Sequence, residues 1–454
     1  MSPKSSRASL ADNPRLFLER KLVSLIRSTV TATCKRCVNS ELSFRDRESV
    51  RSRKGFVSTC EVLETILIPM LDFSDDFLPK VKSERQALEN ELNKALTGIV
   101  DRVKESFETN KPLFPGDPYV NSSGDTMRKG STGFPYIEAN AFFVSVVLHL
   151  LLTLDAFREL PRHVEKSQLR NLATKAIDQI IANFVDEQGW SYSTQEHVVN
   201  IYFTWSVVET LIEVLDSRET CDLIVTDERE RQLKDCLAQV RASLEMYLFG
   251  GSSNATPFLF VPRIIEHERA KVYHDLQAFI TLGLLESERY LDMAQTLVTL
   301  VANSHVIAAQ KDYEVGYLLE DKTFGSARLT DSSILPLVVR AIATVFGEYP
   351  NNDFFSFTEK SRLRDPWSYL IMVDRINELK ANQGSDDLWG PEPDEYEIYY
   401  TERVIESLIS CYHYVTNPDK TGRSLELPPT EIADIHEFNE RLRETGNPKT
   451  NSYG

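Results

Sequence analysis

Apolar residues recur every three or four positions along most of this chain, the spacing that one face of an α-helix produces. Residues 83–107 and 169–185 follow this pattern and predict helices with a single apolar face. Residues 141–154 are apolar nearly all round, which predicts a helix buried on every side. No stretch alternates apolar and polar residues between turn signals, so no sheet is expected. The pattern therefore predicts an all-α protein.

A nine-residue pattern occurs three times without a gap, starting at Thr59, Thr204 and Thr401. It reads Thr-x-x-Val-aliphatic-Glu-[Thr/Ser]-aliphatic-aliphatic. Weaker copies near residues 145, 273 and 331 bring the total to six. Each copy is roughly 60 to 70 residues long, enough for two helices and their loops. The repeat unit is therefore predicted to be an αα-hairpin.

The two helices of each hairpin are expected to differ, because the repeated one is apolar all round and its partner is amphipathic. Six such hairpins close into a double ring, with the repeated helices inside. We expect Thr59, Thr204 and Thr401 on this inner layer. An open solenoid is the competing arrangement, but it would expose both layers at its edges and need polar caps on both end repeats.

Short segments before the repeated helices carry a family resemblance. Residues 180–190 end in Gly189-Trp190, residues 384–390 contain Trp389-Gly390, and residues 133–136 (Gly-Phe-Pro-Tyr) are a degenerate version. These segments resemble the Gln-Trp-type repeat of terpenoid cyclases and protein prenyltransferases. The resemblance covers about residues 55–415.

The resemblance implies an α/α toroid with a deep central cavity. It also implies that Trp190 and Trp389 plug the ring between neighbouring hairpins, so we expect both indoles to be buried wedges that bind no ligand. Several glycoside hydrolases, epimerases and lyases share this architecture, so the fold alone does not transfer a function.

The domain organisation expected from these patterns has four parts. They are a disordered N-terminus over 1–15, an N-terminal helical extension over 16–54, the α/α toroid over 55–415, and a C-terminal tail with one helix over 416–454.

The catalytic motifs of the resembling families are displaced by one residue. The spacing from Asp72 to Asp75 is one residue too long for the acid motif of class II cyclases. The run from Asn352 to Glu359 places its glutamate one position early for the magnesium motif of class I synthases. On a helix, one residue is a rotation of about 100°, so neither motif predicts cyclase chemistry.

The sequence predicts no metal site and no cofactor. Cys34 and Cys37 form a lone CxxC without the second pair of ligands that structural zinc usually has, and they fit an apolar helix stripe. His267 and His274 are about 10.5 Å apart along a helix, too far to share one zinc ion.

A recurring carboxylate and aromatic face is the candidate site. Tyr202, Trp205 and Glu209 share one side of a helix, and Tyr399, Glu402 and Glu406 repeat this spacing. If these helices are inner ones, three acids converge on the axis. The candidate catalytic residues are Glu64, Glu209 and Glu406, and the candidate cavity residues are Tyr202, Trp205, Tyr399 and Glu402. The competing interpretation is that the glutamates serve hydration or packing.

Composition and charge limit the partners. The content of 42% hydrophobic and 26% charged residues is that of a globular protein, and the net charge of −17 disfavours nucleic acid. The apolar run over 141–154 is shorter than the roughly 20 residues that cross a membrane, so no membrane span is expected. A polar N-terminus without a secretory signal, and six scattered cysteines, predict a cytoplasmic protein.

Two functions remain open. The first is a ring-shaped interaction module or scaffold subunit of a multiprotein complex, favoured because no family catalytic motif is intact. A basic partner surface is expected because acids surround Trp389, namely Asp386, Asp387, Glu392, Asp394, Glu395 and Glu397. The second is an enzyme acting on a carbohydrate or isoprenoid-like ligand in the central cavity. Convergence of Glu64, Glu209 and Glu406 within about 10 Å in a solvent-reachable pocket would favour the enzyme.

Overall fold

The computed structural model describes the greater part of the predicted helical region. The described residues are 14–38, 56–73, 79–109, 141–156, 164–185, 188–190, 199, 201–216, 225–250, 268–289, 314–319, 322–328, 331–348, 372, 375–390 and 398–416. They are mostly helical, which confirms the all-α class. The expected disordered N-terminus over 1–15 and the C-terminal tail over 416–454 lie almost entirely outside them.

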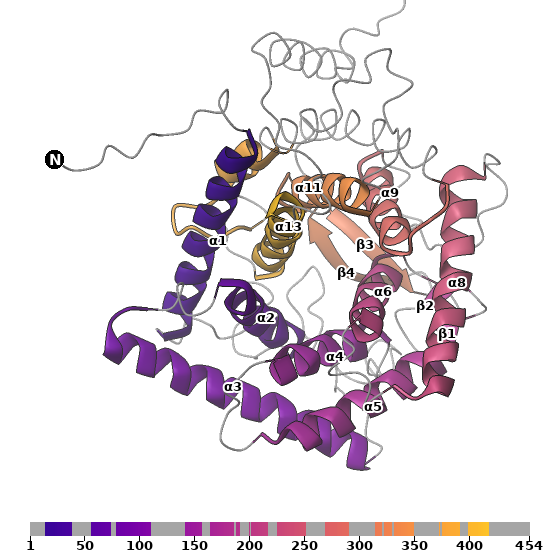
Figure 1. Cartoon of the computed structure of the whole chain (residues 1–454), viewed down its shortest axis with the longest axis horizontal. Helices are drawn as coiled ribbons and strands as arrows, with labels where there is room; N and C mark the ends of the chain where they lie inside the picture. Colours follow the sequence, from indigo (N-terminus) through magenta and orange to yellow (C-terminus); the bar gives the residue numbers. More distant parts are fainter. Residues whose placement is uncertain are drawn as a thin grey trace, which may run out of the picture.

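Six helices follow one another in a closed cycle of contacts (Figure 1). In order round the cycle they are α2 (Phe56–Phe73), α4 (Ala141–Ala156), α6 (Ile201–Asp216), α9 (Glu268–Leu284), α11 (Asp331–Glu348) and α13 (Ile398–Thr416), after which α13 contacts α2 again. The three exact copies of the repeat lie on α2, α6 and α13. We call these six the inner helices.

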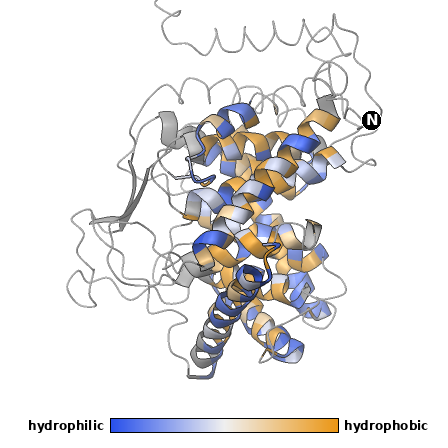
Figure 2. Ribbon diagram, turned by 90° about the vertical axis from the view of Figure 1, so that its left-hand side faces the viewer, coloured by the Kyte–Doolittle hydropathy of each residue, from blue (hydrophilic) through white to orange (hydrophobic). Residues whose placement is uncertain are grey.

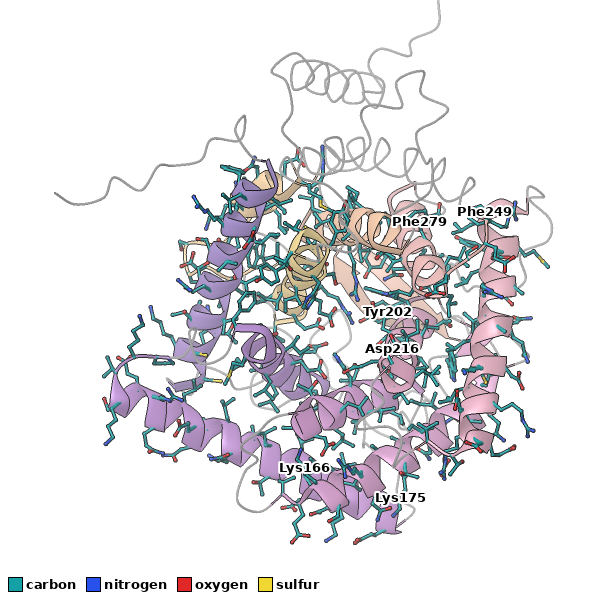
Figure 3. All side chains as sticks on the ribbon, in the orientation of Figure 1. Lys166, Lys175, Tyr202, Asp216, Phe249 and Phe279 are labelled. Atoms are coloured by element: carbon teal, nitrogen blue, oxygen red, sulfur yellow. The ribbon has the colours of Figure 1, made fainter. Side chains whose placement is uncertain are left out.

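Among the described residues, four long helices pack outside the inner ones (Figure 1). They are α1 (Pro14–Val38), α3 (Lys82–Thr109), α5 (Lys166–Ala182) and α8 (Asp227–Phe249). In the predicted extension over 16–54, α1 contacts α13, α2 and α3, and it buries Leu18 and Leu22 in the common core. Figure 3 labels Lys166 and Lys175 on α5, and Tyr202 on the inner helix α6.

The inner helices are buried on nearly all sides because their sequences are apolar all round. On α4, residues 144–148 and 150–155 are all buried, and hydrophobic ribbon dominates the middle of the molecule (Figure 2). The Thr or Ser of the repeat satisfies its hydroxyl within its own helix, because Thr65, Thr210 and Ser407 each donate to the carbonyl four residues earlier. These hydroxyl groups can therefore be buried among apolar side chains without losing a hydrogen bond.

Two tryptophans join the inner helices to the segments that precede them. The backbone N–H of Trp190 donates to Thr204 Oγ1 at 3.1 Å, and the indole Nε1 donates to the carbonyl of Ile180 at 2.9 Å. The Thr204 hydroxyl donates back to the Trp190 carbonyl at 3.4 Å. Trp190 is completely buried, as predicted.

The second tryptophan repeats these contacts. The Trp389 N–H donates to Thr401 Oγ1 at 3.0 Å, the indole donates to the Leu379 carbonyl at 3.0 Å, and the Thr401 hydroxyl donates to the Trp389 carbonyl at 3.0 Å. Trp389 is also completely buried, so the predicted burial is confirmed for both indoles. We call each Trp–Thr pair with these three bonds a clamp.

Gly189 is required next to the first clamp because no side chain fits there. A Cβ atom at this position would lie 2.5 Å from Thr204 Oγ1 and 2.8 Å from Val199 Cγ1. The glycine that precedes the tryptophan therefore lets the chain approach α6 closely.

The expectation of no sheet is wrong, because the structure contains two short antiparallel hairpins. One pairs β1 (Phe184–Val185) with β2 (Gly189–Trp190), and the other pairs β3 (Glu314–Leu319) with β4 (Lys322–Arg328). Their sequences lack strict alternation of polar and apolar residues, and β3–β4 has a register shift after Gly316. The period-two test therefore missed them.

Candidate functional site

Ionisable residues of the inner helices lie at a common depth. Glu64, His149, Glu209 and Glu406 are each the ninth residue of their helix, and Arg340 is the tenth of α11. Several of these residues contact one another, as side chains at equal depth do when neighbouring helices run parallel. We call these five residues, together with Glu213, Glu402 and Arg403, which form ion pairs with them, the axial layer.

Two arginines hold the carboxylates of α6 and α13. Arg340 of α11 forms ion pairs with Glu209 and, at 3.4 Å, with Glu406. Arg403 of α13 reaches the same Glu406 carboxylate at 2.8 Å and its neighbour Glu402 at 3.3 Å. Two of the three predicted acids therefore share one guanidinium.

A histidine links the third predicted acid to α6. His149 Nδ1 of α4 lies 3.5 Å from Glu64 Oε1 of α2, and its Nε2 lies 3.1 Å from Glu213 Oε2 of α6. Glu64 also interacts electrostatically with Glu406 and Arg403. All three candidate glutamates therefore belong to one connected set of charges.

The predicted aromatic residues lie beside the arginines. The guanidinium of Arg403 lies 5.6 Å from the Tyr202 ring centroid and 5.0 Å from that of Trp205, and Arg340 lies 5.4 Å from the Trp205 centroid. The Arg403 Nη2 also donates to the Tyr202 hydroxyl at 3.3 Å. Both rings are buried, Trp205 to 1% exposure. Tyr399 belongs to α13, but its side chain lies outside the described residues.

These aromatic contacts cross the ring. In the cycle of inner helices, α13 and α6 are separated by two helices in either direction. Arg403 of α13 nevertheless contacts Tyr202 and Trp205 of α6. Side chains therefore fill the axis at this depth, near the N-terminal ends of the inner helices.

Burial and the arginines shift the carboxylate pKa values in opposite directions. Burial raises the pKa of Glu209 to about 7, against the opposing effect of Arg340. Burial acts in the same direction on Glu406, but Arg403, a hydrogen bond with Glu402 and Arg340 together outweigh it and hold that pKa at about 2. Burial also raises the pKa values of Glu64 and Glu402, although His149 and Arg403 oppose it.

The His149 pKa is shifted upward by its two carboxylate partners. Burial alone would lower it, but Glu213 and Glu64 carry it well above the ordinary value. The imidazolium form is therefore the one that joins α2, α4 and α6.

Sequence reasoning missed the cations of the axial layer. His149 is the one ionisable residue before Asp155 in the apolar run of α4, and Arg340 interrupts the apolar run of α11. Arg403 immediately follows the predicted Glu402. A lone charged residue inside an all-round apolar helix was the available signal, because its charge must find a buried partner.

The cysteine pair belongs to the core, as the sequence indicated. Cys34 and Cys37 are buried on α1, and burial raises the pKa of the Cys34 thiol to about 12. Among the described residues no group of His, Cys, Asp and Glu is arranged to hold a metal ion. No helix in this part of the chain is long and apolar enough to cross a membrane.

Comparisons with protein-family models, with curated proteins and with solved structures find no match to this chain.

Proposed function

We propose that this chain is an α/α toroid that serves as a ring-shaped interaction module, a scaffold subunit of a multiprotein complex. The closed cycle of inner-helix contacts supports the toroid. The two clamps support the resemblance to the Gln-Trp-type repeat, because Trp190 and Trp389 make the same three bonds.

One observation carries the scaffold function: each repeat glutamate is held by a cation from another inner helix. Arg340 holds Glu209 and Glu406, and His149 holds Glu64. Carboxylates in these pairs join inner helices to one another and are not free as an acid–base pair. The glutamates then recur in the repeat because they hold the inner helices together.

The partner is expected to present a basic surface. The net charge of −17 attracts cations at long range. In the loop before Trp389, Asp386 pairs with Arg36 and Asp387 with Lys380, but the two aspartates remain 42% and 50% exposed. These carboxylates can still contact a partner while they hold α1 and residues 375–381 in place.

Cross-linking of the full chain at its native expression level tests the scaffold function. We expect lysines of the partner to be cross-linked to this chain near residues 384–390. The amount of cross-linked partner that is recovered should fall at high salt, because exposed ion pairs are screened. Asp386→Asn with Asp387→Asn should reduce recovery, and the control Glu228→Gln on α8 should not. A chain recovered alone at both salt concentrations would contradict the proposal.

A second candidate is the enzyme acting on a carbohydrate or isoprenoid-like ligand. It is favoured by the opposite pKa shifts of Glu209 and Glu406, which give one protonated and one ionised carboxylate on the same guanidinium. That is the arrangement that general acid catalysis of glycoside cleavage uses.

Turnover assays on fluorogenic glycosides and prenyl diphosphates test this candidate. Activity should fall as the pH rises through about 7, because Glu209 must be protonated to act as the acid. Glu209→Gln and Glu406→Gln should each abolish it, while Glu228→Gln retains it. Absence of turnover of both classes, or activity that survives both axial substitutions, would exclude this candidate.

A further inference from the structure

The most exposed residues of the outer helix α1 carry charge of one sign. They are Arg20, Ser24, Arg27 and Lys35, and we call these four residues the basic stripe. Their spacing of four, three and eight residues places them along one side of α1, which lies at the edge of the ring (Figure 1). Glu19, the one acidic residue of α1, is partly buried. The exposed side of α1 is therefore positively charged along its length.

Two other outer helices intersperse both signs. The exposed side chains described on α3 include three lysines and three acids, and those on α8 include two basic residues and three acids. Opposite charges also pair along these helices, as Arg85 does with Glu89 on α3 and Arg231 with Glu228 on α8. Such mixed charges are typical of a helix that faces only water. The basic stripe departs from this pattern, which points to a partner of opposite charge.

The segment beside α1 does not neutralise the basic stripe. Residues 375–390 follow one flank of α1, where Lys21 donates a hydrogen bond to Asn377 and Arg36 pairs with Asp386 at 2.6 Å. Arg36 is not a member of the stripe, and it already occupies this carboxylate. The acidic loop before Trp389 therefore uses a different cation of α1.

The two ends of the basic stripe carry charge without a local counter-charge. Arg20 and Lys35 form no ion pair with any described residue. The flank adds further positive charge, because burial and the neighbouring Lys380 together lower the pKa of Lys21. A surface field of one sign attracts a partner of the opposite sign. The charges of α1 are therefore complementary to an acidic partner.

The spacing of the charges favours a helical partner. Arg20 and Arg27 are about 10.5 Å apart along the axis of α1, and Arg27 and Lys35 about 12 Å, which is close to two turns in each case. A second helix lying alongside presents carboxylates at this interval when its acids recur every two turns. An extended peptide presents side chains on one face at about 6.6 or 13 Å, so it matches the stripe less well.

A membrane surface and a nucleic acid fit the stripe less well than an acidic helix does. A helix that lies on a membrane needs an exposed apolar face, but Leu18 and Leu22 of α1 are buried in the core, and Lys21 lies over the ring of Phe17 at 5.8 Å from its centroid. A nucleic acid is a long polyanion, and the net charge of −17 opposes it. A short acidic helix carries fewer charges, and screening confines its contact to the nearby stripe.

We propose that the basic stripe of α1 docks an acidic α-helix of a partner protein, whose carboxylates lie two turns apart on one face. The proposal rests on the proposed function, since both treat the chain as an interaction module. It uses a surface that is separate from residues 384–390 and opposite to them in charge.

Fluorescence anisotropy of the full chain with a labelled synthetic peptide tests the proposal. The probe is an alanine-rich helical peptide with three glutamates two turns apart on one face. Its control has the same composition, with the glutamates on three different faces. We expect saturable binding of the probe at low ionic strength, weaker binding of the control, and loss of both at high salt. A short DNA duplex or phosphatidylserine vesicles that bound more tightly than the probe would overturn the proposal.

Two double variants locate the docking surface. Arg20→Gln with Lys35→Gln should weaken the probe roughly tenfold, because each lost pair of exposed charges weakens binding about threefold. Lys94→Gln with Lys104→Gln removes the same charge from exposed positions of α3 and should leave binding unchanged. Both variants should keep the thermal unfolding midpoint of the parent, because all four side chains are exposed. No binding, equal affinity for both peptides, or equal weakening by both variants would overturn the proposal.

The outcome can be separated from that of the scaffold test. Neither double variant changes Asp386 or Asp387, and the peptide assay needs no cross-linked partner. A peptide that fails to bind while a partner is still cross-linked near residues 384–390 would contradict the basic stripe alone. A peptide that binds while no partner is cross-linked there would contradict the acidic loop alone.

Discussion

The outward and axial faces of the repeated inner helices differ in how closely their copies agree. On the outward face, Trp190 and Trp389 make the same three hydrogen bonds, two with the threonine of the inner helix and one from the indole to a backbone carbonyl. The equivalent bonds differ in length by at most a few tenths of an ångström. Each inner helix packs in the same way against the segment that precedes it, so the same residues recur in each copy.

The axial face agrees less closely, although Tyr202 of α6 corresponds to Tyr399 of α13. Glu209 and Glu406 occupy the same position, but Trp205 of α6 corresponds to Glu402 of α13, and Ser206 corresponds to Arg403. The axis is a single centre that all inner helices share, so each helix supplies a different group to it. The packing face is therefore repeated more strictly than the axial face, although the candidate acids themselves recur in each exact copy.

Removing a clamp tryptophan should have the largest effect. Trp190→Ala or Trp389→Ala leaves a cavity and orphans a carbonyl, and each should lower the free energy of unfolding by about 3–5 kcal/mol. Denaturant titration measures the loss. Met246→Ala, at an exposed position of α8, is the control and should change little. A midpoint unchanged in both tryptophan variants would show that neither indole is a wedge.

Breaking the axial layer should cost nearly as much. Glu406→Gln removes the carboxylate that Arg403 and Arg340 share, leaving buried guanidinium charge undercompensated. The loss of a buried ion-pair partner typically costs about 3–5 kcal/mol. The exposed Glu228→Gln should stay within about 0.5 kcal/mol of the parent. Equal stability of the two variants would mean that the axial pairs contribute no more than surface pairs.

The pH dependence of the free energy of unfolding should come from carboxyl groups on the axial face and not from the outward face. The Glu209 pKa is about 7 when folded, above its ordinary value of 4.5. The folded chain then binds more protons than the unfolded one between these values, so Glu209 lowers stability as the pH rises from about 4.5 to 7. The groups that act on it are Arg340, Glu406, Arg403 and His149.

Glu209→Gln cannot titrate, so its stability should fall less over this interval than that of the parent. One proton corresponds to a slope of at most about 1.4 kcal/mol per pH unit. Unfolding by urea at pH 5 and pH 7 measures the difference, and Glu228→Gln should retain the parent slope. If the free energy of unfolding changed with pH equally in Glu209→Gln and in the parent, the Glu209 carboxyl would not titrate in this interval.

Helix positions and burial could be predicted from the sequence, because apolar periodicity is local. The inner positions of Thr204 and Thr401 follow from it, whereas the burial of Trp190 was expected from the resemblance to the Gln-Trp-type repeat. The candidate acids were found because they repeat. Their cations were not, because Arg340 reaches Glu209 from a helix more than a hundred residues away, and only the closed cycle brings the two together. The hairpin β3–β4 was missed because its pairing, not its alternation, defines it.

The hydroxyl of the clamp should show the smallest effect and test whether the two copies are equivalent. Thr204→Val and Thr401→Val keep the shape but leave the tryptophan N–H and carbonyl unpaired, at a cost of about 1–2 kcal/mol each. Thr97→Val is the matched control, since the Thr97 hydroxyl bonds only to the Asn93 carbonyl of its own helix at 2.7 Å and is exposed. Because the clamp bonds are alike, the two losses should agree within about 0.5 kcal/mol. A large loss of stability in only one of the two threonine variants would mean that the two clamps differ in strength although their bond lengths are alike. One hairpin would then stabilise the ring more than the other.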